Sequence, residues 1–210
     1  TAHYDHLGKH DSLIFNGADD DASGTVAAME IAEAFMLAKK QGYGPRRSVL
    51  IMLVSGEEKG LLGSKYYTDN PIYPLKNTIA NLNIDMIGRI GDFHTQPNYV
   101  YLIGSDRLST DLHNLSEEVN KKHINLELDY TFNSEEDPNR YYYRSDHYNF
   151  AKNNIPVIFY FNGIHEDYHK STDTIEKIDF DKIRKIARFI FLTAWEVVNR
   201  EERIVLDNVQ

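Results

Sequence analysis

The sequence of 210 residues contains no cysteine, and this absence excludes several kinds of site. Disulfide bonds, thiolate metal ligands and cysteine nucleophiles all need that side chain. The absence does not identify a cellular compartment, because many exported bacterial proteins also lack cysteine.

Long apolar runs and an excess of basic residues are missing as well. No stretch approaches the roughly 18 apolar residues that a membrane-spanning helix requires, and no signal peptide is recognisable. With 32 acidic against 23 basic residues, the net charge is −9. Nucleic-acid binding needs a basic face for the phosphates, so we expect neither a membrane-spanning segment nor a nucleic-acid partner.

Internal repeats, low-complexity segments and long blocks of like charge are also absent. A chain of this length suits one domain, and its 41% hydrophobic residues can supply a core. The opening "TAHYDHLG" is an extended-looking stretch that begins without a lead-in. We therefore expect one domain over residues 1–210 that lacks the N-terminal part of a longer precursor, and the oligomeric state stays open.

Short apolar runs alternate with helical patterns along the chain, which is typical of a layered α/β fold. The run "SVLIMLVS" (48–55) is almost wholly apolar, and we interpret it as a buried central strand. The polar segment 131–145 is predicted to be a long loop, a kind of segment that often carries function. Further strands are predicted at 78–88, 99–104, 125–130 and 155–161, and helices at 23–40, 59–68, 107–122, 146–153 and 180–200.

Acidic residues and histidines gather where the predicted strands end. In open α/β sheets the ligand crevice lies beyond the carboxyl ends of the strands. Carboxylate and imidazole groups suit zinc and related divalent ions, so the pattern indicates a metal site. The groups are His3 and Asp5 on the first extended stretch, the three aspartates of "GADDDASG" (17–24), Glu57 and Glu58 after strand 48–55, Asp85 late in strand 78–88, and His169.

Each of these groups also has a purely structural interpretation. "DDDASG" before helix 23–40 can be a helix N-cap, and "SGEEKG" can be a solvated turn with glutamates in a first helical turn. Single histidines are more often structural than metal-binding. Asp85 is harder to explain in this way, because it interrupts an apolar strand and a buried carboxylate needs a partner. The metal hypothesis therefore rests on the coincidence of all five positions.

Six motifs resemble those of the co-catalytic zinc exopeptidases: "HYD", "GADDDASG", "SGEEKGLLGS", "NIDM", "RSDH" and "YHKSTD", in that order. This family includes the bacterial leucyl aminopeptidases, with glutamate carboxypeptidase, glutaminyl cyclase and the transferrin receptor as relatives. The resemblance runs from residue 2 to about residue 200. It implies a three-layer α/β/α sandwich around a mixed, mostly parallel twisted sheet. Such enzymes usually carry a further N-terminal portion ahead of the first histidine.

Carried over by position, the resemblance implies a site for two zinc ions. His3 and Asp85 would be terminal ligands of one zinc, and Glu58 and His169 of the other. Asp20, the middle acid of "DDD", would bridge both ions, which lie about 3.5–4 Å apart in two-metal sites. Two dications at this position would offset the repulsion between adjacent acids.

The resemblance also implies supporting contacts around these ligands. Asp5 would accept the second ring N–H of His3 and so orient the imidazole. The other implied supports are backbone or outer contacts of Asp19 and Asp21, a role of Asp173 in holding the turn of His169, and a cis peptide bond between Asp20 and Asp21.

Peptide hydrolysis follows from these parts. Two zinc ions lower the pKa of a shared water toward about 7, and a free carboxylate then takes its proton and passes it to the leaving amine. Neighbours on an extended backbone point to opposite sides, so Glu58 would bind metal while Glu57 acts as this general base. Spacing before "SDH" favours Tyr142, within the run 141–143, as the oxyanion donor. The alternative for these tyrosines is packing within the loop.

We expect a metallo-aminopeptidase that removes an apolar N-terminal residue, such as leucine, from a peptide substrate. Four residues resemble the apolar specificity pocket of the family, although ordinary core packing explains them nearly as well. We further expect an exported bacterial enzyme that is periplasmic, at the cell surface or extracellular. The pocket residues are Met86, Phe159, Phe161 and Tyr168.

Three other functions stay open on the same fold. A glutaminyl cyclase is a transferase with one working zinc, and the complete ligand set favours a peptidase over it. A carboxypeptidase would meet an acidic or C-terminal substrate with a cationic pocket, for which Arg144 is the obvious local candidate. An inactive binding module of the transferrin-receptor kind should have lost ligands, whereas all five positions are filled here.

Overall fold

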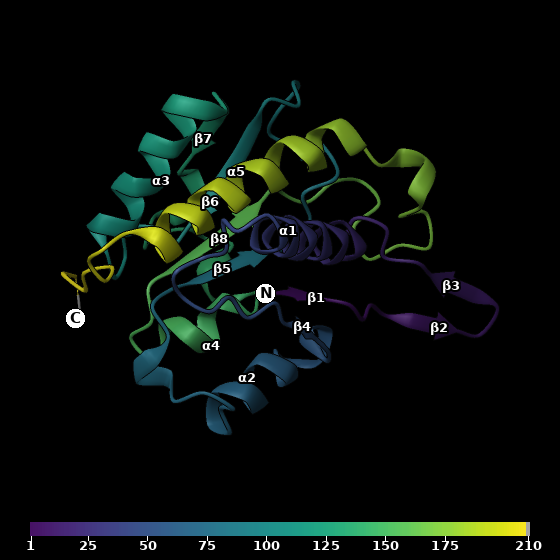
Figure 1. The fold of residues 1–210 in the computed structure, drawn as a ribbon. Coiled ribbons are helices and arrows are strands. Elements are labelled where there is room, and N and C mark those ends of the chain that lie inside the picture. The colour runs from purple at the N-terminus through teal and green to yellow at the C-terminus, as the bar shows by residue number, and fades with distance from the viewer. Residues whose placement is uncertain (209–210) are drawn as a thin grey trace.

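The computed structural model describes residues 1–208, and a mixed sheet lies at its centre (Figure 1). Three pairs of neighbouring strands run parallel, and one pair, β6 with β8, runs antiparallel. The sheet is therefore mixed and mostly parallel, as predicted. The parallel pairs are β1 (Ala2–His3) with β4 (Leu53–Val54), β5 (Asn81–Ile84) with β8 (Val157–Phe161), and β6 (Tyr99–Ile103) with β7 (Glu127–Asp129).

Main-chain hydrogen bonds at Thr1 join β1 to the rest of the sheet. The amino group of Thr1 donates to the carbonyl of Leu82 over 2.7 Å. The N–H of Ile84 donates to the carbonyl of Thr1 over 2.9 Å. The strands therefore follow the order β4-β1-β5-β8-β6-β7, and the contact of β1 with β5 adds a fourth parallel pair.

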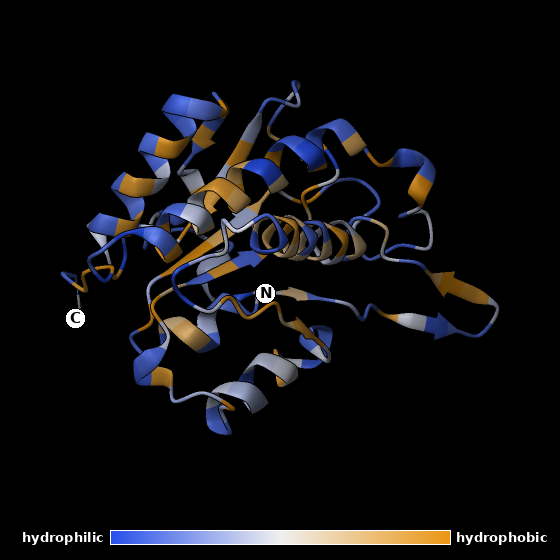
Figure 2. Ribbon diagram, viewed as in Figure 1, coloured by the Kyte–Doolittle hydropathy of each residue, from blue (hydrophilic) through white to orange (hydrophobic). Residues whose placement is uncertain are grey.

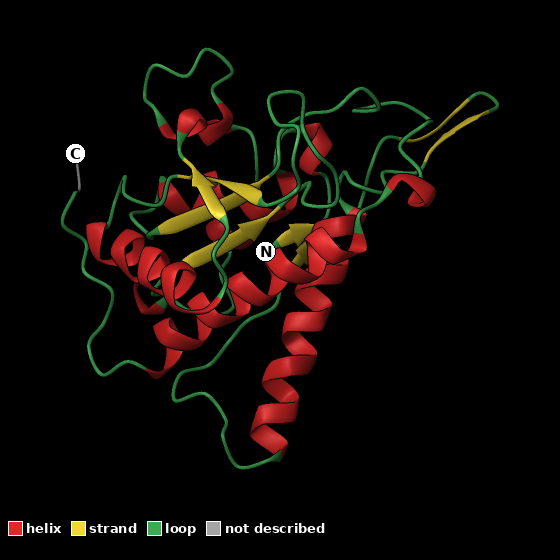
Figure 3. Cartoon of the chain, turned by 90° about the horizontal axis from the view of Figure 1, so that it is seen from above, coloured by secondary structure: helices red, strands yellow, loops and turns green. Residues whose placement is uncertain are grey.

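Helices cover both faces of this sheet (Figures 1 and 3). One face carries α1 (Ala22–Lys40), α3 (Thr110–His123) and α5 (Phe180–Asn199), and α5 contacts both of the others. The opposite face carries α2 (Leu62–Asp69) and α4 (His147–Ala151), which contact each other. The three-layer α/β/α sandwich is thus confirmed. No helix within residues 1–208 is long and apolar enough to span a bilayer.

Two apolar cores hold the sandwich together, one under each helix layer. β6 ("YVYLI") and β8 ("VIFYF") are buried over their whole length, as expected for central strands that are covered on both faces. Their alternate side chains enter opposite cores, so that Leu102 and Tyr160 lie on the α5 side and Tyr101 and Phe161 on the other. Figure 2 shows the apolar strands inside and the polar outer surfaces of the helices.

The largest difference from the sequence prediction lies at residues 48–55. Only Leu53–Val54 forms a strand there. Its partner β1 reaches Met52 through the N–H of Ala2, and residues 48–51 have no main-chain hydrogen-bond partner within residues 1–208. An apolar, β-branched run becomes a strand only where another strand pairs with it, and this run lacks that partner along most of its length.

Smaller elements also differ from the prediction. A hairpin of β2 (Gly8–His10) and β3 (Leu13–Phe15) was missed, and it projects beyond the sheet (Figure 1). The segment 131–145 is not a plain loop, because it contains two 3₁₀ helices, Thr131–Asn133 and Tyr141–Tyr143. Further 3₁₀ helices are Glu57–Lys59, Leu75–Asn77 and Ile175–Lys177.

Candidate metal centre

Five segments of the chain meet at the carboxyl ends of the strands, and each supplies a carboxylate or an imidazole. His3 ends β1, and Asp85 follows β5 directly. Glu58 lies in the 3₁₀ helix that follows β4. Asp20 comes from the loop before α1, and His169 from the loop after β8. This is the sheet edge at which the sequence predicts a ligand crevice.

Asp20 lies between two groups of side chains. Its Oδ1 is 3.2 Å from Nε2 of His3, and that nitrogen is 3.7 Å from Oδ1 of Asp85. Its Oδ2 is 3.2 Å from Nε2 of His169, and that nitrogen is 3.1 Å from Oε2 of Glu58. The two oxygens of one buried carboxylate therefore face two separate pairs of ligand-type residues.

The two outer aspartates of "GADDDASG" bond to backbone instead. Oδ1 of Asp21 accepts from the N–H of Gly24 over 2.9 Å and from that of Met86 over 3.1 Å, so Asp21 caps α1 and ties it to the end of β5. Oδ1 of Asp19 accepts from the N–H of Gly88 over 2.6 Å. The predicted backbone contacts of these two acids are confirmed.

Asp173 and a glycine shape the same loop. The Asp173 carboxylate accepts from the N–H groups of Asp19 and Asp20 over 3.0 and 3.2 Å, so it holds the acidic loop itself. At Gly17 the backbone φ is +62°, and an added Cβ would lie 2.3 Å from the carbonyl oxygen of Asp20. Only glycine fits there. The peptide bond between Asp20 and Asp21 is cis, as predicted.

His6 is a site residue that the sequence analysis missed. Its Nδ1 lies 2.9 Å from Oε1 of Glu58 and 3.8 Å from Oδ2 of Asp20. The ring is buried, and within residues 1–208 neither of its nitrogens has a properly aligned hydrogen-bond partner. The available signal was the second histidine of "HYDHLG", which the structure brings to the same centre as His3.

Asp5 supports His3 in a different way from the one predicted. Nδ1 of His3 lies 2.9 Å from the main-chain carbonyl oxygen of Asp5 and 3.9 Å from its carboxylate. The carboxylate instead accepts from the N–H of Gly56 over 2.8 Å. The imidazole is thus oriented by the backbone of Asp5, while the side chain ties the first strand to the turn that precedes Glu57.

The sequence analysis favoured Tyr142 as the oxyanion donor, but Tyr141 is the tyrosine on the wall of the site. Tyr142 packs under the guanidinium of Arg107, 4.2 Å from its ring centre, and edge-on against His147. Both tyrosines belong to the 3₁₀ helix Tyr141–Tyr143, in which successive side chains point in widely different directions. Counting back from "SDH" therefore did not determine which ring faces the carboxylates.

Ser145 and Asn83 orient Asp85, and the sequence analysis assigned neither a role. Oγ of Ser145 donates to Oδ2 of Asp85 over 2.7 Å and accepts from Nδ2 of Asn83 over 2.8 Å. This leaves Oδ1 of Asp85 facing His3. The motif "RSDH" thus reaches the site through its serine.

Packing the acids and histidines together shifts their pKa values. Contacts with the carboxylates of Asp20 and Glu58 raise the pKa of His169 to about 10. Burial raises the pKa of Glu57 to about 9, and repulsion from Asp85 adds to the rise. In the free chain, protons therefore offset the crowded negative charge. A divalent cation would replace those protons.

A partly apolar cleft adjoins these carboxylates. Arg144 also lines it and lies 3.4 Å from the hydroxyl of Tyr168 through one guanidinium nitrogen. The cleft thus offers an apolar surface and a guanidinium beside the acidic centre. The four residues predicted for the specificity pocket all lie on its wall: Met86, Phe159, Phe161 and Tyr168.

The donors at this centre fit zinc. Imidazole nitrogens and carboxylate oxygens are its usual ligands where cysteine is absent. Buried polar atoms normally have partners, yet within residues 1–208 Oε1 of Glu58 and both nitrogens of His6 have none by hydrogen-bond geometry. A cation held by Glu58 at this centre would account for such unsatisfied atoms. Another group of ligand-type residues, His94, Glu127 and Asp129, lies at β7, where Glu127 is exposed.

The chain is similar to zinc peptidases in sequence and in fold. The model of peptidase family M28 matches residues 1–194. A probable zinc metalloprotease of Pyrenophora tritici-repentis is 47% identical over 76 residues, which is 34% of this chain and 14% of the relative. A probable glutamate carboxypeptidase of Arthroderma benhamiae is 35% identical over 95 residues, which is 43% of this chain and 13% of the relative.

Among solved structures, BSAP, a zinc aminopeptidase from Bacillus subtilis, matches with a TM-score of 0.74 and 22% identity. The match covers 100% of this chain and 48% of that structure. The chain therefore spans about half of the length of that enzyme and a small part of the two curated relatives.

Proposed function

This chain belongs to peptidase family M28, and from that premise we propose that it acts as a zinc-dependent aminopeptidase with two zinc ions at its centre. His3 and Asp85 would hold one ion, Glu58 and His169 the other, and Asp20 both. The observation that carries the proposal is the position of Asp20, whose two oxygens each lie 3.2 Å from a histidine of a different pair.

Two zinc ions bound there would act as Lewis acids and lower the pKa of a shared water toward about 7. The chain's own part is to hold and move the proton. Glu57 lines the same cleft, and its carboxylate makes no hydrogen bond within residues 1–208. Its pKa of about 9 in the free chain keeps a proton on it at neutral pH, and bound cations would displace that proton; the carboxylate could then accept a proton from water and deliver it to the nitrogen of the leaving group.

The cleft supports a preference for an apolar residue at the N-terminus of the substrate. Four of its wall residues, Met86, Phe159, Phe161 and Tyr168, are apolar or aromatic and lie beside Asp85 and Glu58. Burial of a leucine-sized side chain there would contribute roughly 1.5–3 kcal/mol to binding. Tyr141 shares the wall and replaces Tyr142 as our candidate for the oxyanion donor.

A carboxypeptidase is the second candidate, and Arg144 favours it. Its guanidinium is the kind of group that binds a substrate carboxylate in a bidentate manner, and it lines the same cleft. One of the relatives described above is a probable glutamate carboxypeptidase.

A substrate panel tests the two candidates. Purified, zinc-loaded protein is offered leucyl p-nitroanilide, an N-acetylated dipeptide with a C-terminal glutamate, and a peptide that begins with glutamine. Aminopeptidase activity predicts cleavage of the first, and Arg144→Gln should leave that cleavage within about threefold. Cleavage of the second with loss in Arg144→Gln supports the carboxypeptidase. Pyroglutamate from the third supports a glutaminyl cyclase, and no reaction with two zinc ions bound supports a binding module.

Export from the cell stays a prediction for this chain. Fractionation of cells that produce the full natural protein, with activity measured in each fraction, tests it.

A further inference from the structure

The loop of residues 164–173 brings His169 to the candidate centre. The side chain of His169 is 35% exposed, whereas that of His3 is 1% exposed. Its nearest aromatic neighbour is Tyr168, at 3.9 Å between ring centres, and Tyr168 belongs to the same loop. The backbone φ of His169 is +56°, in the left-handed region that residues other than glycine rarely adopt. Such a conformation persists only where the surrounding structure enforces it, so the position of this imidazole depends on what holds the loop.

An ion-pair cluster holds the middle of the loop, and we call it the Arg89 clamp. Oδ2 of Asp167 accepts from Nη1 of Arg89 over 3.1 Å, and Oδ1 of Asp167 accepts from Nζ of Lys177 over 2.7 Å. Nη2 of Arg89 also lies 3.9 Å from Oε1 of Glu166, whose side chain is 81% exposed. The side chain of Asp167 is only 6% exposed, and a buried carboxylate of this kind needs its partners.

The two ends of the loop are fixed separately from its middle. The N–H of Asp92 donates to the carbonyl of Ile164 over 3.0 Å at the start of the loop. At its end the carboxylate of Asp173 accepts from the acidic loop before α1. Asp167 lies two residues before His169, closer in the chain than either of these anchors. The clamp is therefore the contact best placed to fix the backbone of His169.

Arg89 comes from a rigid segment that follows β5. It lies four residues after Asp85, and Ile87 between them is fully buried. The N–H of Ile87 donates to Oγ of Ser23 in α1 over 3.0 Å. The contact of Arg89 with Asp167 thus joins the loop after β8 to a segment that is itself held against α1.

We propose that Arg89 is a positioning residue for the metal ion at Glu58 and His169. Through Asp167 it holds the loop so that the imidazole of His169 faces the carboxylate of Glu58. A guanidinium has no acceptor atom, so Arg89 acts through the loop and not as a ligand. This inference rests on the proposed function, because it assigns the residue a role toward one of the two zinc ions.

The affinities for the two zinc ions test this role. Arg89→Gln should weaken the binding of one ion about tenfold or more and leave the other within about threefold of the parent. Chelator competition measures both dissociation constants. His169→Ala should lose the same ion and so identifies which constant belongs to it. Arg89→Lys should restore the affinity to within about threefold, because one ammonium group can replace the single hydrogen bond to Asp167.

A double variant tests whether Arg89 acts through Asp167. Asp167→Asn alone should weaken the same ion as Arg89→Gln does. The two changes together should cost clearly less than the product of their separate effects, because residues that act through one contact are not additive. Independent, multiplying effects would mean that Arg89 acts by another route and would overturn the proposal.

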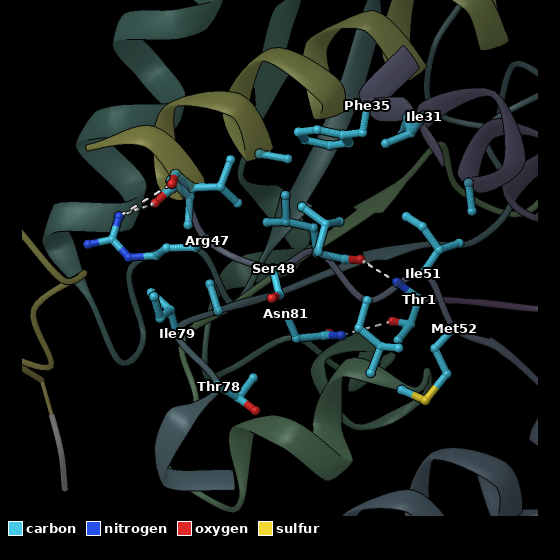
Figure 4. A pocket seen from close by; sticks show the side chains of 18 of the residues that line it. Thr1, Ile31, Phe35, Arg47, Ser48, Ile51, Met52, Thr78, Ile79 and Asn81 are labelled. Atoms are coloured by element: carbon cyan, nitrogen blue, oxygen red, sulfur yellow. Dashed lines mark hydrogen bonds between the residues drawn. The ribbon is translucent and has the colours of Figure 1, made fainter. Parts of the chain in front are cut away.

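Arg47→Gln is the matched control, because Arg47 is also a partly buried arginine that holds backbone. It donates to the carbonyls of Val197 and Val198 over 3.4 and 3.5 Å (Figure 4). It lines a groove of about 650 Å³ that shares no lining residue with the cleft at the acidic centre. Arg47→Gln should lower the melting temperature and leave both zinc constants within about threefold of the parent.

Amide hydrogen exchange of the metal-free protein separates the clamp from the proposed function. Arg89→Gln should speed the exchange of residues 164–172 about tenfold or more, and Arg47→Gln should not. A parent protein that binds no zinc would overturn the proposed function, while the exchange result would still decide whether the clamp holds the loop. Unchanged affinity for both zinc ions in Arg89→Gln, or an equal loss of both, would overturn the positioning role of Arg89.

Discussion

His6 shows how a single imidazole can support the candidate centre. Its Nδ1 lies 2.9 Å from Oε1 of Glu58, while the other oxygen of that carboxylate faces His169. A ring that holds one oxygen in this way leaves the second aimed at a metal. This contact defines a role that is distinct from that of the ligands themselves.

We predict that His6→Asn weakens the binding of one zinc ion about 10–100-fold and leaves the other nearly unchanged, as is typical when a supporting partner of a metal ligand is removed. Competition with a chelator, followed by metal analysis, measures both constants. His10→Asn is the matched control, because His10 lies nearby in sequence and its side chain is 84% exposed. Equal zinc affinities in the two variants would contradict the role of His6.

Glu57 and Glu58 should respond differently to the same chemical change. Gln cannot accept a proton, so Glu57→Gln should keep both zinc ions and lose about 10²–10⁴ in turnover. Glu58→Gln should lose zinc directly. The measurement is zinc per chain together with leucyl p-nitroanilide turnover, with the active parent as reference. If Glu57→Gln keeps more than about a tenth of the parental rate, Glu57 is not the general base.

The raised pKa of His169 predicts a pH dependence of zinc binding. Zinc binds neutral imidazole, and in the free chain Asp20 and Glu58 hold the pKa of His169 at about 10. Below pH 10 the zinc ion held by Glu58 and His169 must therefore displace that proton, so the apparent affinity for this ion should fall about tenfold per pH unit from pH 9 to pH 7. With an ordinary imidazole pKa of about 6.5, affinity would be nearly flat over this range. Chelator competition at pH 7, 8 and 9 distinguishes the two cases.

At the scale of single residues, the sequence predicts the site best where a motif contains the functional residue at one fixed position. The acids of "GADDDASG" and "SGEEKG" and the aspartate of "NIDM" come together as predicted. Tyr141 and His6 were not predictable in the same way, because their roles depend on the rotation of a 3₁₀ helix and on the path of a loop. Ser145 was equally hidden, since its contact with Asp85 joins residues 60 positions apart.

Elements of secondary structure were predictable where their own residues bury a face. The five helices and the strands β5, β6, β7 and β8 all lie within the predicted ranges or within two residues of them. The hairpin β2–β3 was not predictable, because Leu13 and Ile14 are both more than half exposed. The segment therefore lacks the alternation of buried and exposed residues that indicates a half-buried strand. The strand prediction for residues 48–52 failed for another reason, because strand formation there depends on a pairing partner.

The loop before α1 carries Asp20, and Gly24 lies in the first turn of that helix in close contact with its surroundings. A Cβ at Gly24 would lie 2.4 Å from Oδ1 of Asp21 and 2.6 Å from the carbonyl oxygen of Ile84. Gly24→Ala should therefore break the cap of α1 and its contact with β5, and lower the free energy of unfolding by at least about 2 kcal/mol. Urea denaturation of the metal-free protein measures this change.

Gly44→Ala is the control for that experiment. Its added Cβ would meet only the flexible side chain of Lys39 and its Cα, at 3.2 Å or more, and its φ lies outside the left-handed region. We expect a change within about 0.5 kcal/mol there. Similar effects of the two substitutions would mean that the close contacts at Gly24 relax freely.

At the scale of the whole molecule, the acidic centre joins segments that are far apart in the chain. Its residues come from positions 3, 20, 58, 85 and 169, and they link the first strand, the start of α1 and the loop after β8. In the free chain these segments hold like charges close together, in a protein whose net charge is already −9. Metal binding should therefore stabilise the fold as a whole and not only the loops at the site.

Removal of zinc should accordingly lower the melting temperature of the entire chain. A ligand present at 100 times its dissociation constant adds about 2.7 kcal/mol per site, and 1 kcal/mol shifts the melting temperature of a chain of this size by about 2–4 °C. We expect a fall of at least about 5 °C after dialysis against a chelator and recovery when zinc is returned. Asp20→Asn should lose most of this response, because its carboxylate faces both groups. Asp129→Asn should keep it, because Asp129 belongs to the separate group at β7. A response that survives Asp20→Asn and disappears in Asp129→Asn would move the zinc site from the strand ends to β7.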